Sequence, residues 1–204
     1  MFTCFRIVIL FICSTQLYAG SLLGHIKFKD DNGSRQDPRM LVISLKLQSW
    51  NSVNNVESDI HDWLINEICE PYILVVRPRD IVKFRQESKE IRDLLITGRD
   101  DLYILSNRHR LQVRDFERKG YYKIQEHFGV RDLGYLVVDN YDYIVRPGKH
   151  GLIKLDNLPH GHYEVKIYHS VSEQPFKSEL EILENETTSL SLNIDRHMLM
   201  KGGF

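Results

Sequence analysis

The chain has 204 residues, of which 42% are hydrophobic and 27% charged, so it is long enough to enclose a core and has the composition of a globular protein. Its formal net charge of −1 argues against a general nucleic-acid binder, which needs a basic excess or a basic face. We therefore expect a folded domain without nucleic acid among its partners.

The first residues have the pattern of an export signal. A positive charge at Arg6 precedes an apolar run at residues 7–12, and a small residue, Ala19, stands at the expected cleavage point. Because the run is too short to cross a bilayer, we predict a cleaved signal peptide at residues 1–19 and no transmembrane span after cleavage. An uncleaved anchor is the alternative. The mature protein is expected to be periplasmic or secreted.

Cysteine usage fits a periplasmic protein better than a disulfide-rich extracellular one. Cys4 and Cys13 leave with the predicted signal, so Cys69 is the one cysteine of the mature chain. An intrachain disulfide is then excluded. The half-apolar surroundings of Cys69 in the sequence predict a small buried hydrophobe rather than a reactive thiol.

The first half of the mature chain predicts short strands and two short helices. Strands at residues 21–29 and 40–47 flank a turn signal at residues 30–33, so we expect them to pair as a hairpin. Apolar residues recur at helical spacing in residues 57–68 and 88–96, which predicts a helix in each. The remaining strands of this half are expected at residues 71–76, 81–84, 111–114 and 121–124.

The clearest pattern follows in the second half. Tyr163, Val165 and Ile167 alternate with polar residues, as a half-buried antiparallel strand requires. A turn containing Pro159 and Gly161 precedes this strand. Further strands are expected at residues 134–138, 143–145, 152–155, 178–183 and 188–194.

Many short strands separated by regular turn signals are typical of a β-sandwich or a barrel. We predict that residues 20–195 form one all-β sandwich, with short helical insertions between its strands. Residues 134–195 are expected to form its C-terminal strand set, and residues 196–204 a tail.

Two regions resemble cupredoxin-like proteins. Residues 71–84 contain an apolar run, a turn and a Val-x-Phe strand in the order found in that family. The chain from Gly134 onward is similar to the periplasmic cupredoxin relatives called methylamine utilization proteins, with counterparts of their later strands, corner and aromatic-His end at residues 134–138, 151–153, 159–163 and 168–169. The resemblance implies a Greek-key sandwich.

The type 1 copper ligands of that family are missing from this chain. Such a site needs a Cys, two His and usually a weak Met. No histidine occurs at residues 91–93, where the resemblance places the first ligand. Residues 130–133 contain no Cys, His or Met, where it places the ligand loop. The resemblance therefore implies a scaffold without the blue-copper centre, and we predict no cofactor.

Histidines gather in the C-terminal half and offer an alternative. His160 and His162 are two residues apart, with His150 and His169 on either side and His127 upstream. Two or three imidazoles can hold copper(II) or zinc. A copper-binding or electron-transfer protein that uses His127, His160, His162 or His169 is therefore the alternative function. The other interpretation is that these are ordinary side chains of a turn and of strand ends.

A basic stretch follows the strand at residues 71–76. Arg77 and Arg79 are two residues apart, as are Lys83 and Arg85, so each pair is expected to share a strand face. Together with residues 108–110 they form a candidate docking patch for an acidic partner. The alternative is a solvated face balanced by neighbouring acidic residues.

The remaining residue patterns do not indicate catalysis. The tyrosines either form an aromatic platform or pack within strands: Tyr121, Tyr122, Tyr135, Tyr141 and Tyr143. The chain has no nucleophile-elbow motif and no glycine-rich phosphate loop. We therefore predict that it is no enzyme. It is expected to be an exported β-sandwich binding or accessory module whose protein partner docks at Arg77, Arg79, Lys83 and Arg85.

Overall fold

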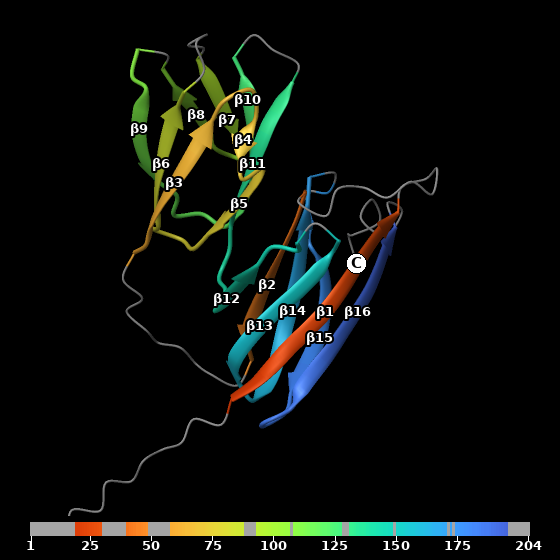
Figure 1. Ribbon diagram of the computed structural model, residues 1–204. Helices are drawn as coiled ribbons and strands as arrows, with labels where there is room; N and C mark the ends of the chain where they lie inside the picture. Colours follow the sequence, from red (N-terminus) through yellow and green to blue (C-terminus); the bar gives the residue numbers. More distant parts are fainter. Residues whose placement is uncertain are drawn as a thin grey trace, which may run out of the picture.

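The computed structural model describes residues 19–29, 40–48, 58–87, 93–106, 108–127, 131–148, 150–170, 172 and 174–195. Most of the predicted signal peptide and the predicted tail at residues 196–204 lie outside these residues, and Ala19 opens the first strand. The described residues form sixteen β-strands and contain no α-helix (Figure 1). The all-β, sandwich-like class expected from the sequence is confirmed.

One block of strands, here called the terminal sandwich, combines segments from both ends of the described chain (Figure 1). Its sheet A has the strand order β13-β1-β16 and its sheet B the order β12-β2-β14-β15. Buried apolar side chains from both sheets, among them Leu22, Leu45 and Tyr163, form its core. The strands are β1 (Ala19–Lys29), β2 (Leu41–Leu47), β12 (Tyr143–Val145), β13 (Leu152–Pro159), β14 (Gly161–His169), β15 (Phe176–Ile182) and β16 (Thr187–Asp195).

The second block, the inserted sandwich, is built from the strands between β2 and β12 (Figure 1). Sheet C has the order β4-β3-β6-β9, and sheet D the order β5-β11-β10-β7-β8. Trp63, Phe84 and Phe116 are fully buried in a separate core. The strands are β3 (Ile60–Ile65), β4 (Cys69–Glu70), β5 (Ile73–Val76), β6 (Ile81–Gln86), β7 (Leu94–Thr97), β8 (Leu102–Leu105), β9 (Leu111–Asp115), β10 (Gly120–Glu126) and β11 (Asp132–Val138).

A third apolar cluster joins the two sandwiches, and we call this contact the junction. Val42 and Tyr168 of sheet B pack there with residues of sheet D such as Val137. Polar contacts add to it, because Lys166 Nζ of β14 donates to Asp139 Oδ2, 2.6 Å away, just after β11. The junction is therefore a packed contact with an ion pair at its edge.

The predicted hairpin of the first two strands is wrong, although both strands exist. β1 pairs antiparallel with β13 and parallel with β16, whereas β2 pairs with β14 and β12. The two strands therefore lie in opposite sheets of the terminal sandwich. A local turn signal favours pairing with the next strand in the sequence. Which strands pair is decided instead by burial of the apolar face of each strand against the core. The turn signal itself, at residues 30–33, lies outside the described residues.

The two predicted helices are wrong where the structure describes them. Residues 60–65 form β3, in which Trp63 and Ile65 are buried while Ile60 and Asp62 are exposed. This burial has the two-residue period of a strand, and parallel pairing with β6 completes the assignment. Residues 94–97 likewise form β7. Residues 88–92 of the second expected helix lie outside the described part of the chain.

The prediction of one sandwich at residues 20–195 differs from the two cores observed. Of the expected C-terminal strand set at residues 134–195, β11 belongs to the inserted sandwich and the later strands to the terminal sandwich. The difference arises because strand positions are local in sequence, whereas the division into cores depends on long-range pairing. The Greek-key cupredoxin topology stays a prediction.

Candidate functional site

One face of sheet C is turned away from the core of the inserted sandwich. In β6, Val82 and Phe84 are buried, so Ile81, Lys83 and Arg85 project from the opposite face. Residues that pair directly in neighbouring strands share a face, so the register extends this set across β3 and β9. The rows are Ile60–Ile81–Asp115, Asp62–Lys83–Val113 and Leu64–Arg85–Leu111. We call these residues the sheet C face.

Apolar side chains make up much of the sheet C face and are open to solvent. Ile60, Leu111 and Val113 are 57%, 52% and 46% exposed. Apolar side chains that lie side by side on a surface mark interaction sites more often than scattered ones. On sheet A, the exposed Leu23 and Leu152 are diagonal neighbours, and their direct cross-strand neighbours are the polar residues Lys154, Ser189 and His25.

Two of the four predicted docking cations belong to this face. Lys83 and Arg85 lie in the central strand β6, and the Arg85 guanidinium contacts the Asp62 carboxylate at 3.3 Å. Both partners of that pair are more than half exposed, so it contributes little stability.

Arg77 and Arg79 do not share a strand face, so that prediction is wrong. β5 ends at Val76, and Arg79 occupies the turn to β6 with a left-handed φ of 73°. Arg77 Nη1 donates to Asp59 Oδ2 at 3.2 Å, and its guanidinium lies over the ring of Tyr141 at 4.8 Å. The Arg77 side chain is therefore engaged within the protein.

Further basic residues lie beside the sheet C face, on β9 and the turn before it. Residues 108–115 contain three arginines and one aspartate. Arg108, Arg110 and Arg114 are all exposed, as are Leu111 and Val113. The exposed edge of sheet C is thus both apolar and basic.

The structure does not gather the four candidate histidines at one place. His127 follows β10 in the inserted sandwich, and His160 occupies the turn between β13 and β14. His162 and His169 lie at opposite ends of β14, seven residues or about 23 Å apart. Only His160 and His162 remain neighbours. Copper binding by these residues stays a prediction, which copper(II) titration of the purified protein would measure.

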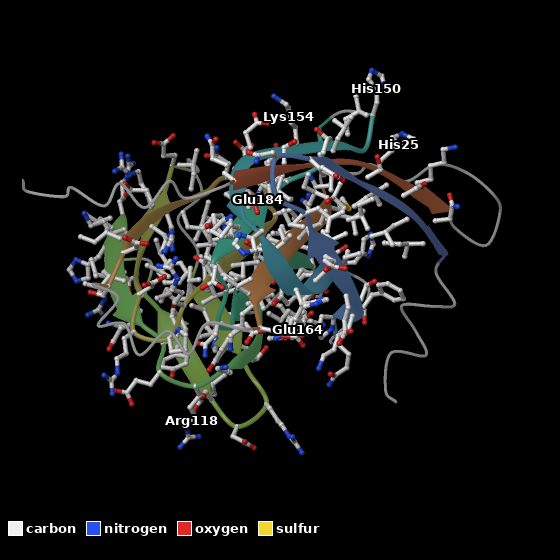
Figure 2. The ribbon with its side chains drawn as sticks, turned by 90° about the horizontal axis from the view of Figure 1, so that it is seen from below. His25, Arg118, His150, Lys154, Glu164 and Glu184 are labelled. Atoms are coloured by element: carbon white, nitrogen blue, oxygen red, sulfur yellow. The ribbon has the colours of Figure 1, made fainter. Side chains whose placement is uncertain are left out.

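The histidines also differ in surroundings. His169 is buried, and burial lowers its pKa to about 4. His162 is exposed, with Nε2 3.8 Å from Glu181 Oε1. His150 and His25 lie together on the terminal sandwich, where His25 Nε2 donates to the His150 carbonyl oxygen at 2.9 Å (Figure 2).

Asp59, His61 and Asp80 form a group that the sequence analysis missed. Among the described residues, it is the one set of three or more His, Cys, Asp or Glu whose ligand atoms lie within 4.8 Å of one another. The Asp80 carboxylate is buried and accepts the backbone N–H groups of Asp59 (3.0 Å) and Arg77 (2.8 Å). It also lies 2.9 Å from His61 Nε2.

These bonds satisfy the Asp80 carboxylate without a metal. They hold the entry of β3 against the turn that precedes β6, so the group has a sufficient structural explanation. A signal for it existed in the sequence, because Asp80 closes a turn that begins at Arg77, and aspartate commonly binds backbone N–H groups in turns.

Cys69 and the tyrosines pack rather than form an exposed site. Cys69 is fully buried, which confirms the predicted small buried hydrophobe, and burial raises its pKa to about 12. Tyr122 is buried in the inserted core and Tyr143 packs against the terminal core. Tyr121, Tyr135 and Tyr141 pack at the junction. The tyrosines are thus divided among three clusters.

No helix within the described ranges is long and apolar enough to cross a membrane. No protein-family model matches the chain, and no curated protein matches it. The resemblance to cupredoxins and the predicted export therefore stay predictions.

Proposed function

We propose that the protein is a non-catalytic, exported binding module that docks a protein partner on the sheet C face. The observation that carries the proposal is the sheet C face itself, where exposed apolar side chains adjoin Lys83 and Arg85 on three neighbouring strands. A mixed surface of this kind suits a protein partner, since apolar contacts supply affinity and charges supply orientation. Export is supported by the predicted signal peptide at residues 1–19.

The charges favour an acidic partner. Lys83 lies at the centre of the face, and its edge strand β9 carries exposed arginines, of which Arg110 and Arg114 project from the opposite side of the strand. Asp62 already contacts Arg85, which leaves Asp115 as the other acidic side chain of the face. A partner with acidic residues around an apolar centre would complement this pattern and would associate faster at low ionic strength.

The test compares charge reversals on two faces of the molecule. One variant combines Lys83→Glu with Arg85→Glu. The matched control combines Lys27→Glu with Lys154→Glu on sheet A, where Lys154 contacts Asp156 at 2.7 Å much as Arg85 contacts Asp62. Figure 2 shows Lys154 on the far side of the molecule from Arg118 of the inserted sandwich.

The wild type and the two variants are each immobilised and exposed to soluble proteins of the source organism. The proteins that each one retains are quantified by mass spectrometry. We expect a set of acidic proteins that the wild type and the sheet A variant retain equally and that the sheet C variant loses. If the two variants retain the same proteins, the sheet C face is not the docking surface.

A further inference from the structure

β9 is the last strand of sheet C and leaves one backbone edge open. Sheet C ends in the order β3-β6-β9, so β9 pairs only with β6 among the described strands. The Gln86 N–H donates to the Arg110 carbonyl at 2.8 Å, so this pair is a hydrogen-bonded pair of the β6–β9 ladder. In an antiparallel pair, residues alternate between facing the partner strand and facing away from it.

The alternation assigns the open edge to particular residues. Arg110, Gln112 and Arg114 turn their backbone groups to β6. Leu111, Val113 and Asp115 therefore turn their N–H and C=O groups outward. The Arg114 guanidinium donates to the Val113 carbonyl at 3.2 Å, as expected for a carbonyl that faces away from β6.

The side chains of these outward-facing residues lie on the sheet C face. Leu111 and Val113 are the exposed apolar residues of its edge row, and Asp115 completes that row. A strand added beside β9 would thus gain ladder hydrogen bonds and apolar contacts from the same residues. Exposed edge strands with this combination are templates for strand addition.

We propose that β9 binds an acidic, extended segment of the partner protein as an additional strand of sheet C. This inference rests on the proposed function and specifies how the partner docks. The arginines at 108, 110 and 114 beside the edge select for acidic residues in the segment. Every second side chain of the segment would lie beside Leu111 or Val113 on the sheet C face, so we expect apolar, β-branched residues at alternate positions.

The probe is a display library of random dodecapeptides, selected on the immobilised full-length protein. We expect enrichment of peptides that are net acidic and carry alternating apolar residues. Their binding should protect the amides of Leu111, Val113 and Asp115 from hydrogen exchange. Enrichment of basic peptides, or no enrichment above a blank support, would overturn the inference.

Proline substitutions test the backbone contact directly. Val113→Pro removes an outward N–H without touching the β6 ladder, and edge strands tolerate such a proline. We expect it to weaken the selected peptides about tenfold, because a strand hydrogen bond is lost and the approach is obstructed. Leu111→Pro serves as a second variant if Val113→Pro does not fold, as judged by circular dichroism.

The matched control is Ile104→Pro on β8, the edge strand of sheet D. Ile104 is 51% exposed. The Gly98 N–H donates to the Asp101 carbonyl, so by the same alternation the backbone groups of Ile104 face away from β7. Ile104→Pro should leave peptide affinity unchanged. Affinity that survives both β9 prolines would overturn strand addition.

The variant that combines Lys83→Glu with Arg85→Glu distinguishes a failure of strand addition from a failure of the proposed function. If Lys83→Glu with Arg85→Glu abolishes binding while the β9 prolines do not, the sheet C face stands as a docking site and strand addition fails. If neither kind of variant alters peptide binding, both proposals fail.

Discussion

At the junction, the fully buried Tyr168 and the partly buried Tyr121 differ in their hydrogen bonds. The Tyr168 hydroxyl donates to Asp139 Oδ2 at 3.0 Å and lies 3.2 Å from Ser44 Oγ. The Tyr121 hydroxyl is buried, and no hydrogen-bond partner reaches it from the described residues. The two rings contact each other, with centroids 5.9 Å apart. Removing the two hydroxyls should therefore have different effects.

We expect Tyr121→Phe to leave the free energy of unfolding unchanged or to raise it by up to about 1 kcal/mol, because an unsatisfied hydroxyl leaves the interior. Tyr168→Phe should lower it by about 1–2 kcal/mol, because a hydrogen bond to a carboxylate is lost. Urea unfolding of the two variants measures the difference. Equal losses would show that the Tyr121 hydroxyl has a partner in solution.

His169 makes stability depend on pH between about 6.5 and 4. Burial lowers its pKa from 6.5 to about 4, so the unfolded chain binds more protons than the folded chain in that range. The stabilisation is complete above pH 6.5 and is lost as the pH falls toward 4. We expect this imidazole alone to reduce the free energy of unfolding by about 2 kcal/mol between pH 7 and pH 5.

Denaturant unfolding at a series of pH values checks this expectation. His169→Gln should flatten the slope between pH 7 and pH 5. The control His162→Gln alters an exposed imidazole and should keep the wild-type slope. A slope that survives His169→Gln would assign the pH dependence to other groups.

At the scale of elements, strand positions follow from local sequence. The alternation at residues 163–167 predicts β14, and Tyr163, Val165 and Ile167 are indeed fully buried. β3 was missed because Ile60, Trp63 and Leu64 also fit a helical spacing. The ambiguity is resolved only by the parallel neighbour β6, which is not visible in the residues of β3 itself.

β11 passes so close to β4 that only glycine fits at position 134. A Cβ there would lie 2.6 Å from Cys69 Cβ and 2.9 Å from the Tyr72 carbonyl oxygen. We expect Gly134→Ala to lower the free energy of unfolding by about 2–3 kcal/mol, because buried backbone must shift. The control is Gly120→Ala, where the nearest atom is 4.0 Å away. Thermal unfolding compares them, and equal melting temperatures would contradict the close packing of β4 and β11.

At the scale of the whole molecule, Asp139 holds the two sandwiches together. It lies between β11 and β12, and its carboxylate contacts Lys166 and Tyr168 of the terminal sandwich and Lys119 of the inserted sandwich. Burial by itself raises the pKa of Asp139, but the hydrogen bonds led by that from Lys166 outweigh it, so the pKa lies below the ordinary 3.8. The stabilisation from Asp139 is therefore present above about pH 4 and is lost as the pH falls through its folded pKa.

We expect Asp139→Asn to lower the free energy of unfolding by about 2 kcal/mol at pH 7, because Lys166 loses its closest partner in a mostly buried site. Asp156→Asn is the control, since its pair with Lys154 is exposed and should contribute well under 1 kcal/mol. Calorimetry at pH 7 and pH 3 measures both variants. Equal effects of the two would contradict a stabilising role of the junction ion pair.

The candidate site could be predicted from the sequence only in part. Lys83 and Arg85 share a face because strand alternation is local, and this much was readable from spacing. Their apolar neighbours on β3 and β9 depend on pairing between segments about 20 to 35 residues apart in the chain, which no local pattern encodes. Arg77 was predicted to belong to an exposed docking patch, because its contacts with Asp59 and Tyr141 come from distant segments and are not visible in the local sequence.

The most direct test of the binding module is to map where a retained protein touches it. Hydrogen exchange of the full chain, alone and with the retained protein, resolves each strand of both sandwiches. We expect protection confined to residues 60–64, 81–85 and 111–115, with β1, β13 and β16 unchanged. Protection on sheet A, or none on sheet C, would contradict the proposed docking surface.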